Sequence, residues 1–124
     1  DIDLHRRDRL EQQLRKLMDD VKHEHGLRVE IREDMRSEPR YCAEYIKSYI
    51  REAAEEMSIK APELMSGPFH DSIAMSYYCD YGMIFVRCKD GISHNPQEYS
   101  SEEDVALGTE LLYQTVLKMC LGQD

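Results

Sequence analysis

Apolar residues recur with the period of an α-helix in three stretches of the chain. In residues 5–25 they fall three or four positions apart, which predicts a helix, and Gly26 directly after it predicts its end. The apolar positions of this helix are Leu10, Leu14, Leu17, Met18 and Val21. A second helix is predicted from Tyr41 to about Met57, with a buried face formed by Ile46, Ile50, Ala53, Ala54 and Met57.

A last helix is predicted after Ser101, because serine caps helix N-termini and the acidic residues that follow suit the positive end of the helix dipole. Its expected buried face consists of Val105, Gly108, Leu111, Leu112, Val116 and Met119. A short helix is also expected from about Asp71 to Tyr78, after a turn at Ser66-Gly67-Pro68.

Two other stretches have the pattern of β-strands. Leu27–Arg32 alternates apolar and polar residues, which predicts a strand with one buried face, and Tyr81–Val86 is a continuous apolar run that suits a strand covered on both faces. Ile2 and Leu4 could be the remnant of a neighbouring strand. The polar segment 33–40 is the best candidate boundary, so we expect an α/β fold in two unequal pieces divided near residue 36.

Composition and charge narrow the classes of partner. The chain has 124 residues and a net charge of -9, which argues against a duplex nucleic-acid partner. The basic residues of the first helix alternate with acidic ones, as on a solvated helix face. No apolar run approaches the roughly 20 residues of a membrane span, so no membrane partner is expected. The four cysteines form no CxxC pair, which favours reduced, buried thiols in an intracellular, by default cytoplasmic, protein. The chain opens on Asp1, which leaves its native start and any targeting signal open.

His70 and His94 are the histidines in positions that suit chemistry. His70 directly precedes a predicted helix, where an imidazole can be aimed into a cleft, although a capping turn with an incidental histidine fits the spacing equally well. His94 follows the apolar strand, where ligands of α/β sheets gather, but a lone histidine in an ordinary turn is an equal alternative. His23 and His25, on the first helix, are expected at the surface, and His5, which precedes or starts that helix, has no nearby ligand candidate.

Three motifs in this order resemble one family. They are Ser66-Gly67-x-x-His70-Asp71, the run Gly82-Met83-Ile84-Phe85-Val86, and Gly91-Ile92-Ser93-His94-Asn95-Pro96-Gln97-Glu98-Tyr99. Together they resemble the C-terminal portion of the allantoate amidohydrolase, ureidoglycolate amidohydrolase and N-carbamoyl-amino-acid hydrolase family. This family belongs to the clan of aminoacylases and carboxypeptidases with paired metal ions.

The resemblance implies that residues 1–36 are the end of an inserted αβ lid domain that forms a homodimer, and that residues 37–124 are the C-terminal part of an α/β catalytic domain. It implies two divalent metal ions, zinc or manganese, with His94 as one ligand. His70 would bind the substrate and act in catalysis by stabilising the developing oxyanion. The implied reaction is hydrolysis of a ureido or carbamoyl C–N bond of a small molecule by a metal-activated water.

Two departures qualify this expectation. Nothing in the chain matches the family's other metal ligands, its general-base glutamate or its lid arginine, so the isolated chain is expected to be inactive. Pro68 and Phe69 also replace the usual Ala-Gly before the histidine, which affects the expected role of His70 more than that of His94. The alternative to an enzyme fragment is a truncated, non-catalytic homologue that acts as a dimerisation or interaction module.

Overall fold

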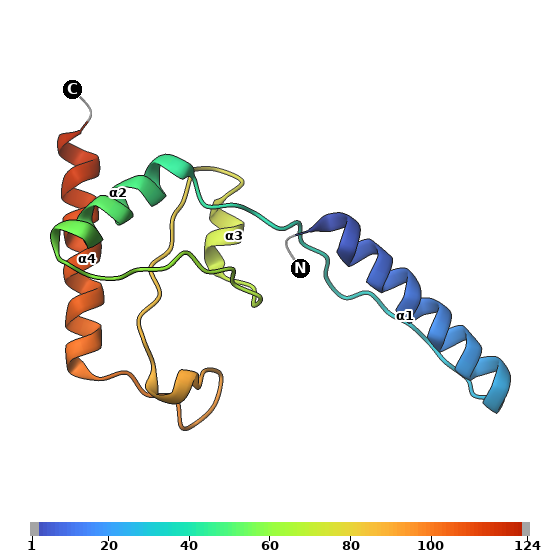
Figure 1. Ribbon diagram of the computed structural model, residues 1–124. Coiled ribbons are helices and arrows are strands. Elements are labelled where there is room, and N and C mark those ends of the chain that lie inside the picture. The colour runs from blue at the N-terminus through green and yellow to red at the C-terminus, as the bar shows by residue number, and fades with distance from the viewer. Residues whose placement is uncertain (1–2, 123–124) are drawn as a thin grey trace. The chain divides into compact units, whose positions relative to one another are not determined.

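The computed structural model describes residues 3–122 as two compact units. The first unit comprises the chain up to Tyr41 together with residues 65–73, and the second comprises residues 42–64 and the chain from Ala74 onwards. The elements, in chain order, are α1 (Leu4–His25), α2 (Glu44–Glu56), α3 (Asp71–Met75), the short 3-10 helix η1 (Lys89–Gly91) and α4 (Glu102–Leu121) (Figure 1). Residues 3–122 contain no β-strand, so the helical part of the predicted fold is confirmed and the strand part is wrong.

The first unit is built on α1, whose two ends are capped as its sequence favours. The Asp3 carboxylate accepts a hydrogen bond from the Arg6 backbone N–H at 3.0 Å, and Gly26 ends the helix in the left-handed conformation with φ 62°. The chain then runs back along α1 (Figure 1). The predicted helix and its glycine stop are confirmed, whereas Leu4 begins this helix instead of a strand; Ile2 lies outside the described residues.

Ion pairs hold the returning segment to α1. Arg15 pairs with Glu33 at 3.6 Å, and Arg36 pairs with Glu11. Glu11 is half-buried, as is Arg7 one turn earlier in the same helix. The charged residues of α1 are therefore not simply a solvated face, because some of them form the surface on which residues 33–38 lie.

The predicted strand at residues 27–32 is irregular chain in the structure. Its apolar residues are only partly covered, with Leu27 52% and Ile31 44% exposed. An alternating pattern favours extended backbone with one covered face, but a β-ladder also requires a second strand for its N–H and C=O groups. The described residues supply no such strand to this segment, so the prediction was wrong.

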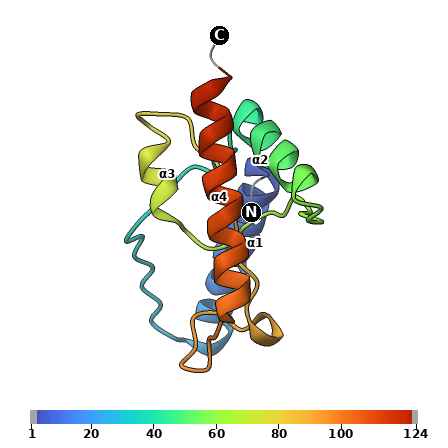
Figure 2. The ribbon, with the colours of Figure 1, turned by 90° about the vertical axis from the view of Figure 1, so that its left-hand side faces the viewer.

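The second unit has its core between α2 and α4, which lie side by side (Figures 1 and 2). Ala53, Ala54 and Leu111 form the buried cluster, and a ring of half-buried side chains packs around it: Ile50, Met57, Ile59 and Ile84. Small alanines on α2 let the axis of α4 come close. The predicted buried face of α2 is confirmed.

Two glycines bring residues 82–86 against these helices. A Cβ on Gly82 would lie 2.5 Å from Ile46 Cγ2, and a Cβ on Gly108 would lie 2.6 Å from Val86 Cγ2. The Ala43 backbone N–H donates to the Tyr81 carbonyl at 2.9 Å and fixes the start of the segment. The strand predicted at residues 81–86 is nevertheless wrong, because this run is irregular and no strand pairs with it in residues 3–122.

The N-terminus of α4 is confirmed, whereas the buried face predicted for this helix is only partly correct. Ser101 Oγ accepts from the Asp104 N–H at 3.1 Å, which confirms the cap. Leu111 is buried as expected, but so is Thr115, whose hydroxyl donates to the Leu111 carbonyl at 2.7 Å. Three residues of the predicted face are about half exposed: Val105, Leu112 and Val116. One neighbouring helix covers a narrow stripe of α4, whereas the apolar pattern extends much further around it.

The cysteines are reduced but not all buried. None of the four forms a disulfide; Cys42 and Cys88 are half-buried, whereas Cys79 and Cys120 are exposed, so the prediction of buried thiols is wrong for these last two. Among the helices of residues 3–122, none combines the length and the apolar character that a membrane crossing requires.

Candidate functional site

His70 lies in the first unit, at the end of a tight turn that leads into α3. Its side chain is half-buried, and Nε2 lies 2.5 Å from the hydroxyl oxygen of Ser66, within hydrogen-bonding distance. The His70 carbonyl accepts from the Ile73 backbone N–H at 2.9 Å, so the residue also forms the first turn of α3. The imidazole is thus fixed both by its backbone and by a serine four residues earlier.

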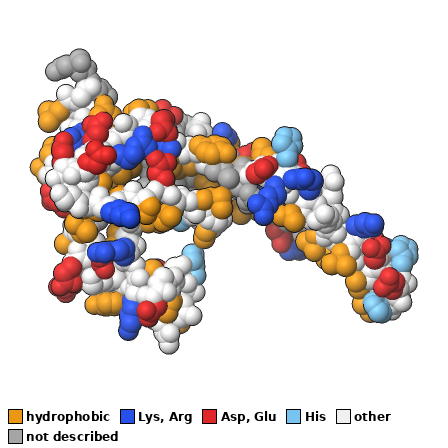
Figure 3. All heavy atoms as spheres, viewed as in Figure 1, with side chains coloured by type: hydrophobic (Ala, Val, Ile, Leu, Met, Phe, Trp, Pro, Cys, Tyr) orange, Lys and Arg blue, Asp and Glu red, His pale blue; other side chains and the backbone are white. Residues whose placement is uncertain are grey.

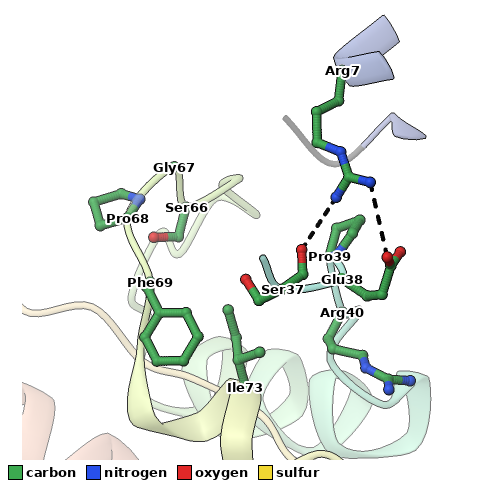
Figure 4. A pocket seen from close by; sticks show the side chains of 10 residues that line it. All are labelled: Arg7, Ser37, Glu38, Pro39, Arg40, Ser66, Gly67, Pro68, Phe69 and Ile73. Carbon is green, nitrogen blue, oxygen red and sulfur yellow. Dashed lines mark hydrogen bonds and ion pairs between the residues drawn. The ribbon is translucent and has the colours of Figure 1, made fainter. Parts of the chain in front are cut away.

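Ser66 also lines a surface depression of about 270 Å³ in the same unit (Figure 4). Its wall comprises Arg7, Ser37, Glu38, Pro39, Arg40, Ser66, Gly67, Pro68, Phe69 and Ile73. The Phe69 ring and Ile73 lie on one side, while the Arg7 guanidinium donates to the Ser37 carbonyl at 3.1 Å and pairs with Glu38 at 3.8 Å on the other. The depression therefore combines an apolar side with a polar side on which Arg7 is already paired with Ser37 and Glu38.

Arg7 and Ser37 were not recognised as neighbours from the sequence. They are 30 residues apart, and they meet only because the chain after Gly26 runs back along α1. Phe69, in contrast, was singled out as a departure from the usual glycine, and its ring forms part of this cavity wall. No local pattern distinguishes Arg7 from the other arginines of α1.

His94 lies in the second unit, in a loop between η1 and α4. Its side chain is exposed, and its backbone is left-handed with φ 55°. Its N–H donates to Glu98 Oε2 at 2.9 Å. A second left-handed residue, Asp90 with φ 56°, lies four positions earlier, within η1, and a left-handed backbone costs a residue other than glycine roughly 1–2 kcal/mol.

The described residues do not fit a metal centre by themselves. Within residues 3–122, no group of three or more His, Cys, Asp or Glu side chains is placed to hold a metal ion. His94 offers one imidazole, whereas a stable zinc site needs three or four protein ligands. His70 belongs to the first unit, and His94 belongs to the second. His23 and His25 are exposed, as predicted, and His5 is exposed as well.

A cluster of charges that the sequence did not reveal joins α2 to the loop after it. Lys47 pairs with Glu44 at 2.7 Å and with Glu63 at 3.0 Å, and Arg51 pairs with the same two carboxylates. Hydrogen bonds from Lys47 and then Arg51 lower the pKa of Glu63 below its ordinary value. This network fixes the path of the chain at residue 63 and lies within the second unit.

Comparison with known proteins identifies the family of the chain. Residues 6–118 match the profile of peptidase family M20/M25/M40, a range that contains both His70 and His94. The chain is 33% identical over 118 residues to an N-carbamoyl-L-amino-acid amidohydrolase of Pseudomonas sp. (strain NS671), covering 95% of the chain and 28% of that protein. It is 40% identical over 85 residues to an N-carbamoyl-L-amino acid amidohydrolase of Geobacillus stearothermophilus, covering 68% of the chain and 21% of the relative.

A plant relative extends the range of named substrates. The ureidoglycolate hydrolase of Arabidopsis thaliana is 43% identical over 70 residues, covering 56% of the chain and 15% of that protein. The chain therefore spans about a quarter or less of the length of these relatives. The resemblance that the three motifs suggested is confirmed. Because the family profile matches nearly the whole chain, the protein belongs to peptidase family M20/M25/M40.

Proposed function

We propose that the chain is part of an amidohydrolase that cleaves the C–N bond of a small ureido or carbamoyl compound. The observation that carries this proposal is the family match over residues 6–118, which spans both candidate histidines. The relatives are named for N-carbamoyl-L-amino acids, ureidoglycolate and allantoate, which share a carbonyl bonded to nitrogen on both sides. These names favour an enzyme over a non-catalytic interaction module.

His94 and His70 have different proposed roles. Members of this family are generally metal-dependent, and we assign His94 as one ligand of a centre of two divalent ions, zinc or manganese. Residues 3–122 contain no group of three or more His, Cys, Asp or Glu side chains placed to hold a metal ion, so His94 would need further ligands from other residues of the enzyme. His70 would bind the substrate and stabilise negative charge that develops on the scissile carbonyl. Its hydrogen bond to Ser66, at the edge of a cavity, supports this role.

The division of the chain into domains is also a proposal. Residues 1–36 would end a lid domain that forms a homodimer, and residues 37–124 would belong to the metal-dependent catalytic domain. The apolar stripe of α1 supports the dimer contact, because Leu10, Leu14 and Leu17 are 53%, 56% and 58% exposed. Orange side chains along α1 are visible between the charged ones in Figure 3. A helix that leaves such a stripe uncovered is typical of an association surface.

Ammonia release by the full-length protein tests the proposed function. The assay offers an N-carbamoyl-L-amino acid, ureidoglycolate and allantoate in turn, with and without a chelator. His94→Ala should abolish most turnover and lower the metal content. His70→Ala should lower kcat by about 100-fold or more while the metal content stays unchanged. His25→Ala is the matched control, because His25 is exposed at the end of α1. Unchanged turnover in His94→Ala would refute the ligand assignment.

A further inference from the structure

The backbone of His94 is held in a conformation that histidine does not prefer. Its φ of 55° is left-handed, and its side chain is exposed, so packing against a core does not impose this conformation. Hydrogen bonds between residues of the loop restrain its backbone. Those bonds identify the residue that fixes His94.

Glu98 connects to the loop through both its side chain and its backbone. Its Oε2 accepts from the His94 N–H at 2.9 Å, and its own N–H donates to the Asn95 carbonyl at 2.9 Å. Between them, Asn95 Oδ1 accepts from the Gln97 N–H at 2.9 Å. Residues 94–98 are thus closed into one hydrogen-bonded turn, and the carboxylate of Glu98 supplies the bond at His94. A hydrogen bond to an ionised acceptor is shorter and stronger than one between neutral groups.

We propose that Glu98 is a positioning residue that sets the direction of the His94 imidazole. This inference rests on the proposed function, in which His94 takes part at the reaction centre. The value of φ fixes where the Cα–Cβ bond points, and the bond to Glu98 holds that value on the left-handed side. Without the carboxylate, the residue returns to negative φ and the ring points elsewhere. Glu98 acts through His94 and touches no reacting atom.

Three variants of the full-length protein separate this role from a general effect on the loop. Glu98→Ala should lower kcat by about 10-fold to 100-fold with KM nearly unchanged, as for other residues that orient a functional histidine. Glu98→Gln keeps an acceptor oxygen at the same reach and should restore most of the rate. Gln97→Ala is the control, because Gln97 is exposed and contributes its backbone N–H to the turn. It should leave kcat unchanged.

A coupling measurement shows whether the effect passes through His94. In the His94→Ala background, adding Glu98→Ala should cause no further loss of kcat/KM, since the group being positioned is already absent. A full additional loss in that background would overturn the inference. A Glu98→Ala enzyme with the rate of the unmodified protein would also overturn it, provided that His94→Ala has lost most, but not all, of its turnover.

Amide hydrogen exchange provides a readout that does not depend on activity. The His94 amide should exchange faster in Glu98→Ala than in the unmodified protein, and at the original rate in Gln97→Ala. If the His94 amide exchanges at the same rate in Glu98→Ala as in the unmodified protein, the proposed role of Glu98 is overturned, whatever the values of kcat and KM. Full activity in His94→Ala would instead refute the proposed function, and with it the catalytic relevance of Glu98, even if the exchange result is as expected.

Discussion

The hydroxyl oxygen of Ser66 lies 2.5 Å from Nε2 of His70, and the same serine lines the cavity of the first unit. One side chain therefore connects the candidate histidine to the pocket beside it. The two residues are four apart in a turn interrupted by Pro68, so the contact depends on the turn and not on a helical spacing. In the proposed role of His70, Ser66 orients the imidazole ring that acts on the substrate.

Ser66→Ala should lower kcat/KM by about 2-fold to 10-fold in the full-length protein, which corresponds to the roughly 0.5–1.5 kcal/mol of one hydrogen bond. Steady-state kinetics on the best ureido or carbamoyl substrate measure the effect. Ser48→Ala is a suitable control, since the Ser48 hydroxyl donates to Glu52 of the same helix, at 3.4 Å. Equal rates for Ser66→Ala and the control would mean that the contact does not matter for catalysis.

Gly108→Ala should destabilise the protein despite the better helix propensity of alanine. Propensity favours the substitution by about 1 kcal/mol, but the new Cβ would lie 2.6 Å from Val86 Cγ2, and such overpacking costs about 1–3 kcal/mol. Urea unfolding measures the net loss. Adding Val86→Ala to Gly108→Ala should recover stability, because it removes the clashing methyl group. A double variant less stable than Gly108→Ala alone would contradict the close approach.

Gly26→Ala should cost about 1–2 kcal/mol of stability through backbone strain alone. Gly26 has φ 62°, and a Cβ there would meet no atom within 4 Å, so crowding plays no part. Thermal unfolding compares this variant with Gly67→Ala, a position that is equally open but does not have the left-handed φ. A similar loss of stability in both variants would argue against a left-handed cap at Gly26.

Acidification should weaken the ion pairs that Lys47 and Arg51 form with Glu63, and thereby lower the stability of the fold. Hydrogen bonds from Lys47, then Arg51, lower the pKa of Glu63 in the folded protein. The ionised Glu63 carboxylate therefore stabilises the fold above the pKa of about 4.3 that a glutamate has in the unfolded chain. This contribution is lost as pH falls through the lower pKa of Glu63 in the folded protein. Thermal unfolding from pH 7 to pH 3 should show a smaller acid-induced decrease in Tm for Glu63→Gln than for the unmodified protein. Glu55→Gln, an exposed site on α2, should retain the full decrease.

Local signals in the sequence predicted the helices and their ends well. The apolar period located α1 and α2, and Ser101 and Gly26 marked the caps that the structure contains. These features depend on residues within one or two turns of each other, so neighbouring side chains and backbone sterics determine them. The turn at His70 and the loop at His94 were located for the same reason. Their proposed roles came from the family resemblance and not from spacing.

The apolar pattern of single segments predicted two strands that the structure does not contain, and it predicted a larger buried face on α4 than the structure has. Leu27–Arg32 and Tyr81–Val86 have strand-like sequences, yet residues 3–122 provide no strand for them to pair with. Val105 and Val116 match a buried helical face, but α2 covers only the stripe around Leu111 and Thr115. Pairing and burial both require a second segment, and one segment's pattern cannot identify it.

The sequence by itself determined where the helices lie and cap, which histidines stand in turns, and which family the chain resembles. Only the tertiary structure placed Arg7 beside Ser37, Ser66 against His70, and the Glu98 carboxylate on the His94 N–H. The reason is physical: helix propensity and caps act over a few residues, whereas a contact depends on the path of the chain through every turn between its partners. The identity of the candidate residues was therefore readable from the sequence, but the groups that orient them were not.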